Sequence, residues 1–99
     1  MQFLQIEHFA PHLNDTFHVD VGEGESAFVL VEVKPLQGAG PTMQGAVRAG
    51  FSLLFHNTAA IVFPQRIYAM KHRGLGEFGI FLVAIARDAN GFIYQAIYN

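Results

Sequence analysis

The side chains best suited to chemistry in this 99-residue chain are its five histidines, which stand among only six basic and eight acidic residues. His8 and His12 are four positions apart, so a helix would place both imidazoles on one face. Zinc requires three or four ligands in a fixed geometry, and no third ligand follows this pair at a useful spacing. His18, His56 and His72 fall on three separate predicted strands. We therefore expect surface or half-buried histidines, and neither a metal site nor a cofactor site.

Other catalytic patterns are also missing from the sequence. The segment 38–45 is rich in glycine like a phosphate-binding loop, but it lacks the lysine of such loops and a strand pattern follows it at Phe51. Ser26 and Ser52 lie in strand patterns and outside a Gly-x-Ser-x-Gly turn. The chain has no cysteine, which removes thiol catalysis and cysteine-ligated zinc. No pair of carboxylates has a spacing that indicates acid–base catalysis. We therefore predict that the protein is not an enzyme.

The composition excludes several classes of protein and of binding partner. Hydrophobic residues make up 52% of the chain and charged residues 14%, against about 25% charged in typical domains, which excludes intrinsic disorder. A net charge of −2 argues against a nucleic-acid partner. The longest apolar run, 78–86, is far shorter than the ~20 residues of a membrane-spanning helix. The N-terminal residues do not resemble a signal peptide. We expect one domain over residues 1–99, made in the cytosol.

Hydrophobic periodicity predicts an all-β fold. Apolar residues three and four apart suggest a short helix or turn over 7–13, which Pro11 limits. Beyond it, alternation of polar and apolar residues and Gly-containing turns predict successive strands. An Asn-Gly pair at 90–91 favours a tight hairpin turn. The segments expected to be strands are 16–21, 26–34, 51–56, 67–72, 77–87 and 92–98. Six antiparallel strands, joined mostly by short turns, would form a meander rolled into a small barrel or folded into a sandwich.

The strand predicted over 77–87 is apolar on both faces. Residues 78, 80 and 82 alternate with 81, 83 and 85, and one of these faces must be the core, although the sequence does not say which. A strand that is apolar on both faces must have both faces covered. The second face could be covered by another part of the chain or by a second molecule, and the sequence favours neither alternative. Aromatic residues of the kind enriched at interfaces lie close by in the last strand. The candidate interface residues are Phe78, Ile80, Phe81, Leu82, Val83, Ile85, Tyr94 and Tyr98.

Eight segments spread over nearly the whole chain together form a recognisable pattern. They are Phe9-Ala10-Pro11-His12, Phe51-Ser52-Leu53-Leu54-Phe55, Phe63-Pro64-Gln65, Ile67-Tyr68, His72, Leu75-Gly76-Glu77, Phe81-Leu82-Val83 and Tyr94-Gln95-Ala96-Ile97-Tyr98-Asn99. The chain is similar to a bacterial family of stand-alone domains of about this length, known only as a domain of unknown function. The resemblance implies a weak association with phage-tail-collar and microcystin-dependent-type proteins, and it implies no active-site residues. The usual Gly after Pro-Gln is Arg66 here, so the turn at that point is expected to differ.

Two functions from different classes are compatible with these observations. The first is a non-enzymatic structural or assembly module that self-associates or docks onto a larger assembly, one related to tails or fibres if the resemblance holds. The alternative is a small-ligand-binding β-barrel in which the 35–50 loop serves as a lid, with or without enzymatic activity, since small barrels can hold one ligand. The fold alone does not decide between them.

Overall fold

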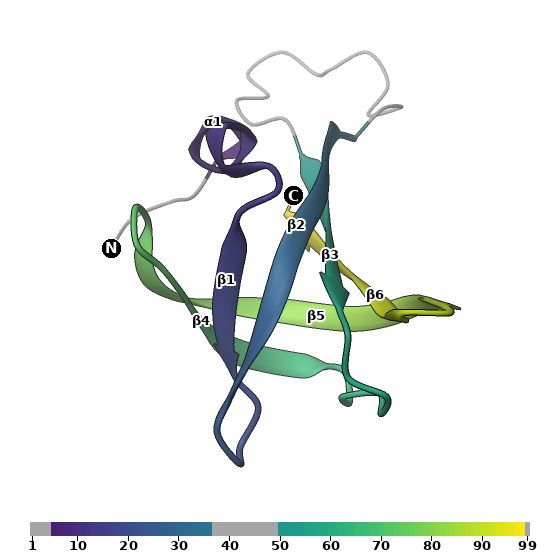
Figure 1. The fold of residues 1–99 in the computed structure, drawn as a ribbon. Coiled ribbons are helices and arrows are strands. Elements are labelled where there is room, and N and C mark those ends of the chain that lie inside the picture. Colours follow the sequence, from purple (N-terminus) through teal and green to yellow (C-terminus); the bar gives the residue numbers. More distant parts are fainter. Residues whose placement is uncertain (1–4, 37–49, 99) are drawn as a thin grey trace.

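The computed structural model describes residues 5–36 and 50–98 and shows a closed, antiparallel β-barrel with a short helical segment over one end (Figure 1). The helical segment is an α-helical turn continued by a 3₁₀ turn. Six strands follow it, each within one residue at either end of the range predicted from hydrophobic alternation. The elements are α1 (Ile6–Phe9), η1 (Ala10–His12), β1 (Thr16–Asp20), β2 (Glu25–Pro35), β3 (Phe51–Asn57), β4 (Arg66–His72), β5 (Gly76–Asp88) and β6 (Gly91–Tyr98).

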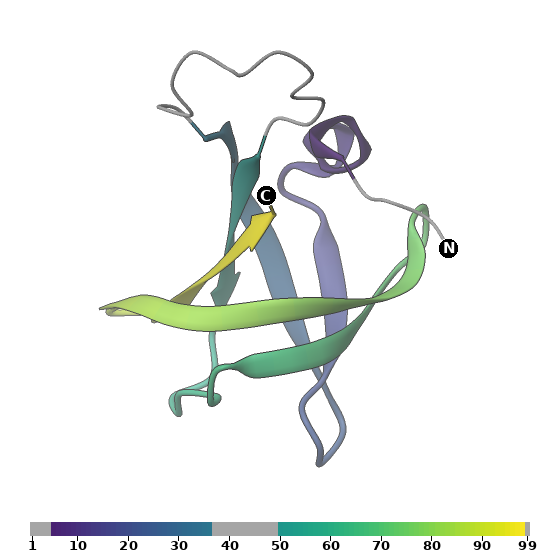
Figure 2. The same ribbon diagram turned by 180° about the vertical axis from the view of Figure 1, so that it is seen from behind.

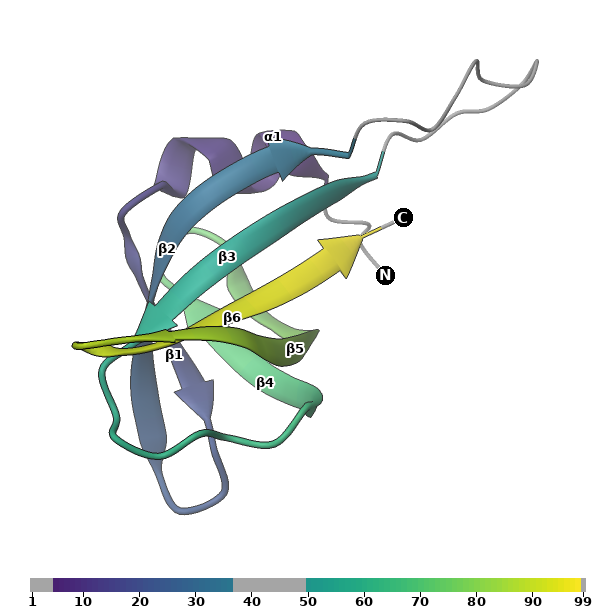
Figure 3. The ribbon, with the colours of Figure 1, turned by 90° about the vertical axis from the view of Figure 1, so that its right-hand side faces the viewer.

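The barrel consists of two three-stranded meanders joined along two seams. Around the barrel the strands follow the order β1-β2-β3-β6-β5-β4, so β3 pairs with β6 rather than with β4. The β3–β6 seam is long and runs from Phe51↔Tyr98 to Asn57↔Phe92. The β4–β1 seam has only two paired positions. The sequence pattern is compatible with either a barrel or a sandwich. Because the two seams close the sheet on itself, the fold is a barrel (Figure 3).

Strand β5 is the longest element and pairs with a different neighbour in each half. Its first half pairs with β4 and its second half with β6, so it bends across the back of the molecule (Figure 2). The register between β5 and β6 shifts at Ala84/Ala86, a bulge of the kind that increases local twist. Ile85 is the extra residue of that bulge.

The barrel interior is filled by side chains. Fourteen apolar residues form one buried cluster, drawn from α1 and all six strands. Phe9 of α1 is fully buried and contacts the rings of Phe17, Phe51, Phe78 and Tyr98, with centroids 5.8–6.5 Å away. The helical segment therefore closes one end of the barrel by inserting a single aromatic side chain. This explains why so short a helix is part of the core.

Candidate functional site

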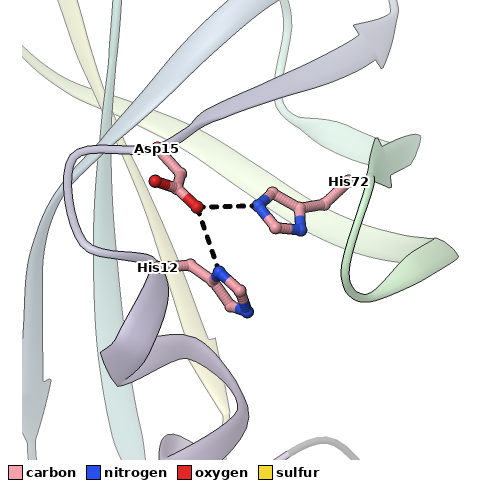
Figure 4. A group of neighbouring side chains, drawn as sticks. All are labelled: His12, Asp15 and His72. Carbon is pink, nitrogen blue, oxygen red and sulfur yellow. Dashed lines mark hydrogen bonds and ion pairs between the residues drawn. The ribbon is translucent and has the colours of Figure 1, made fainter.

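Three side chains from two distant parts of the chain meet beside the capped end of the barrel (Figure 4). His12 ends η1, Asp15 lies in the connection between η1 and β1, and His72 is the last residue of β4. Asn14 has a left-handed backbone (φ 73°), and the N–H of Asp15 donates to the carbonyl of His12 at 2.9 Å. This tight turn folds Asp15 back over His12 and aims its carboxylate at the end of β4.

Both imidazoles contact the same carboxylate oxygen. His12 Nδ1 and His72 Nε2 each lie 3.0 Å from Asp15 Oδ2, and both nitrogens point towards it (Figure 4). The two imidazole rings are close, with centroids 4.2 Å apart. The His72 side chain is only 7% exposed and its ring packs 4.5 Å from that of Phe17. His12 and Asp15 are partly open to solvent.

The hydrogen bonds determine which nitrogen of each neutral imidazole carries the proton. The N–H of Gly74 donates to His72 Nδ1 at 2.9 Å, so His72 carries its proton on Nε2 and donates it to Asp15. His12 donates from Nδ1, which leaves its Nε2 as an acceptor. These donors hold the pKa of the Asp15 carboxyl below its usual range, the bond from His72 being the larger cause. We call His12, Asp15 and His72 the His–Asp–His cluster.

The sequence did not reveal this cluster. His8, which lies four positions before His12, is outside the cluster and accepts the N–H of Gln5 through Nδ1 at 2.7 Å. His56 lies 3.4 Å from Asp88, apart from the cluster. Asp15 follows His12 by three positions, which is a weak local signal. His72, however, is 57 positions from Asp15 in the chain, and only the closure of the barrel brings it there.

The candidate interface residues divide between the two faces of the barrel wall. Ile80, Leu82 and Tyr94 are buried in the core, so they are not accessible to a partner and leave the candidate interface. Phe78 and Tyr98 are half-buried and pack against the same core. The interior face of β5 is thus the even-numbered one, the choice that the sequence left open.

The odd-numbered face of β5 lies outside the barrel. Phe81 and Ile85 are about half exposed, and Val83 between them is half-buried. Two further isoleucines, which sequence reasoning did not select, are exposed on the neighbouring strands. Ile67 of β4 pairs directly with Phe81, and Ile97 lies on β6, two residues beyond the partner of Val83. We call these five residues the outer apolar strip: Ile67, Phe81, Val83, Ile85 and Ile97.

The ligand-binding alternative gains little from the geometry of the described residues. A ligand inside the barrel would have to displace aromatic and aliphatic side chains that are 0–3% exposed. Most of the 35–50 loop, the expected lid, lies outside the described residues. Beside the His–Asp–His cluster is a hollow of about 370 Å³ that is open to solvent. It is lined by His18, Lys71, His72, Arg73, Gly76 and Glu77.

Comparison with known proteins gives a family but no function. Among the described residues there is no helix long and apolar enough to cross a membrane. No curated protein and no solved structure matches the chain significantly. A family model described as "Domain of unknown function (DUF6916)" matches residues 4–98.

Proposed function

The chain belongs to this family of unknown function, and we propose that it is a non-enzymatic assembly module that associates with a second copy of itself through the outer apolar strip. The observation that carries the proposal is the exposure of large apolar side chains on adjoining strands of a barrel whose core is already complete. Their exposed fractions are 70% for Ile67, 48% for Phe81, 49% for Ile85 and 50% for Ile97.

The chemistry of the strip favours another apolar surface as its partner. None of its five residues is charged, and the arginines Arg66 and Arg87 flank it in sequence, which resembles an apolar interface centre with a polar rim. The chain itself offers such a surface. Two copies related by a twofold axis, the commonest symmetry of oligomers, would place one strip against the other without burying an unpaired charge.

The expected affinity follows from the apolar surface of the strip that is still exposed and that a dimer would bury. Complete burial of a large apolar side chain contributes about 1.5–3 kcal/mol. Three of the four exposed residues are already covered over about half of their surface, and Ile67 over less. Two strips bring eight such side chains together, which gives a gross gain of roughly 6–12 kcal/mol. Association costs about 4–15 kcal/mol in lost freedom of motion. We therefore expect weak, reversible association that strengthens when several copies are held on one scaffold. Docking onto a tail- or fibre-related assembly, which the family resemblance implies, belongs to the same proposal.

A matched pair of substitutions tests this function. Ile67→Lys places a charge on the most exposed residue of the strip, where burial in a dimer would leave it unpaired. Ile61→Lys is the control, because Ile61 is 64% exposed on the β3–β4 connection, outside the strip. Sedimentation velocity over a range of concentrations should show association of the wild type and of Ile61→Lys, and monomers for Ile67→Lys. Equal association of all three proteins would refute the strip as the interface, and a wild type that is monomeric throughout would refute self-association.

A further inference from the structure

We propose that His12, Asp15 and His72 form a binding site for a divalent transition-metal ion of the zinc class, with water completing its coordination. This site is separate from the outer apolar strip and independent of the proposed self-association. The three ligand atoms would be His12 Nδ1, Asp15 Oδ2 and His72 Nε2, which all lie within 4.8 Å of one another.

The spacing of the ligand atoms suits an ion of this size. Zinc binds imidazole nitrogen and carboxylate oxygen at about 2.0–2.2 Å in tetrahedral geometry, so two of its ligand atoms lie roughly 3.4 Å apart. Each imidazole nitrogen of the cluster is 3.0 Å from the carboxylate oxygen. Small rotations of the rings would turn the nitrogens from the oxygen towards an ion lying between all three atoms.

The donor set selects the class of ion. Two imidazoles and one carboxylate suit zinc and its first-row neighbours, whereas magnesium and calcium prefer oxygen ligands alone. Three protein ligands with a partly solvent-exposed Asp15 leave at least one position for water, as in zinc sites that are not closed by a fourth side chain. His72 is held by its contact with the Phe17 ring, so one ligand is fixed before the ion arrives.

Metal binding replaces the two hydrogen bonds from the imidazoles to Asp15. It also breaks a third hydrogen bond, and that loss can be measured. Each neutral imidazole must move its proton to the nitrogen that does not bind the metal. For His12 that nitrogen is Nε2, which donates to no carboxylate in this arrangement. For His72 it is Nδ1, which now accepts the N–H of Gly74 at 2.9 Å. That hydrogen bond must therefore break, and because Gly74 lies in an exposed turn between β4 and β5, water can replace it.

The site would join three separate parts of the chain. His12 belongs to the segment that carries the Phe9 plug, Asp15 leads into β1, and His72 ends β4 beside the turn to β5. The β1–β4 seam itself has only two paired positions. An ion at the cluster would hold the cap and this seam together, so binding should raise the melting temperature.

The test is a titration of the chelator-treated 99-residue protein with zinc sulfate, followed by calorimetry and thermal melting. We expect one ion per chain, a higher melting temperature, and with Co²⁺ a visible absorption band. His12→Gln and Asp15→Asn should each lose at least tenfold in zinc affinity. His8→Gln is the control, because His8 lies one helical turn from His12 but outside the cluster, and it should bind zinc like the wild type. Circular dichroism of each variant checks that it is folded.

Three results would overturn the site: no zinc binding by the wild type, affinity unchanged in both cluster variants, or a loss in His8→Gln equal to that in His12→Gln. The Gly74 amide gives a readout independent of substitution. In ¹H–¹⁵N spectra its resonance should shift on zinc binding and its hydrogen exchange should become faster. Zinc binding that leaves the Gly74 amide unchanged would show that His72 is not a ligand and would also refute the proposal.

Discussion

Removal of one hydroxyl group, in Tyr98→Phe, should make the protein more stable. The Tyr98 ring stacks on Phe51 with centroids 4.8 Å apart and planes 4° from parallel, at the end of the barrel that Phe9 closes. Its hydroxyl oxygen is buried and has no hydrogen-bond partner among the described residues. An unsatisfied buried polar group costs about 1–3 kcal/mol. We therefore expect the free energy of unfolding at neutral pH to rise by about 1 kcal/mol or more, while the stacking is retained.

The same hydroxyl gives the prediction a pH dependence. Burial raises the pKa of Tyr98 to about 12, whereas an unfolded chain ionises its tyrosines near pH 10. The neutral form is thus favoured in the folded state, and its contribution is complete below pH 10 and lost as the pH rises from there towards 12. A difference of about two pKa units sets the upper limit of this loss of stability at about 2.7 kcal/mol. Because the ring is partly exposed to solvent, we expect a loss of roughly half that size. The advantage of Tyr98→Phe should therefore grow above pH 10.

Tyr94→Phe is the matched control with the opposite sign. The Tyr94 hydroxyl accepts the backbone N–H of Phe63 at 2.8 Å, so its removal leaves that donor without its partner and should cost about 1–2 kcal/mol. Urea unfolding followed by far-ultraviolet circular dichroism measures both variants against the wild type between neutral pH and pH 11. A destabilised Tyr98→Phe variant, or two variants that shift in the same direction, would refute the assignment of Tyr98 as unsatisfied.

Three further changes test the packing, the turn and the surface charges. Phe9→Ala should lower the free energy of unfolding by about 3–5 kcal/mol, because Phe9 is fully buried among four rings. Urea unfolding measures this loss, and a value below 1 kcal/mol would contradict the role of Phe9 in closing the barrel. Gly91→Ala should fail to fold or lose several kcal/mol, since an added Cβ would lie 2.0 Å from the carbonyl oxygen of Asn57 at a φ of 144°; a normal melting temperature would contradict this. The Lys71 ammonium, 2.7 Å from Glu25, lowers the pKa of that carboxyl, so its contribution to stability is present above the unfolded pKa and lost as the pH falls. Glu25→Gln should accordingly show a shallower loss of stability in acid, and an unchanged pH profile would exclude this pair as a contributor.

The strands could be predicted from the sequence because hydrophobic alternation is a local signal. Residues 16–20 alternate so clearly that the pattern alone identifies Phe17 and Val19 as the inward residues, and both are buried. For strand β5, hydrophobic alternation could not predict which face is buried. Its two faces are equally apolar, and the choice of the Ile80 and Leu82 face as core depends on which neighbours cover it. Those neighbours are set by the β3–β6 and β1–β4 seams, which are pairings between distant segments.

The candidate sites were less predictable for the same reason. The exposed position of Ile67 on the outer apolar strip depends on its pairing with Phe81, and nothing in the local pattern of β4 distinguishes it from a core residue. His12 and Asp15 are close in sequence, but a histidine and an aspartate three apart at a turn are common. Their third partner, His72, arrives only because the helical cap and the end of β4 lie at the same end of the barrel (Figure 1).

The most direct test of the assembly proposal is the mass of the wild-type particle as a function of concentration, measured by sedimentation equilibrium on metal-free protein. The weak interface calculated for the outer apolar strip predicts one chain per particle at low concentration and a reversible rise towards two as the concentration increases. The unfolding midpoint should rise in parallel, because association stabilises the folded chain. A particle of one chain over the whole range, with an unfolding midpoint independent of concentration, would contradict the proposal that this protein is a self-associating module.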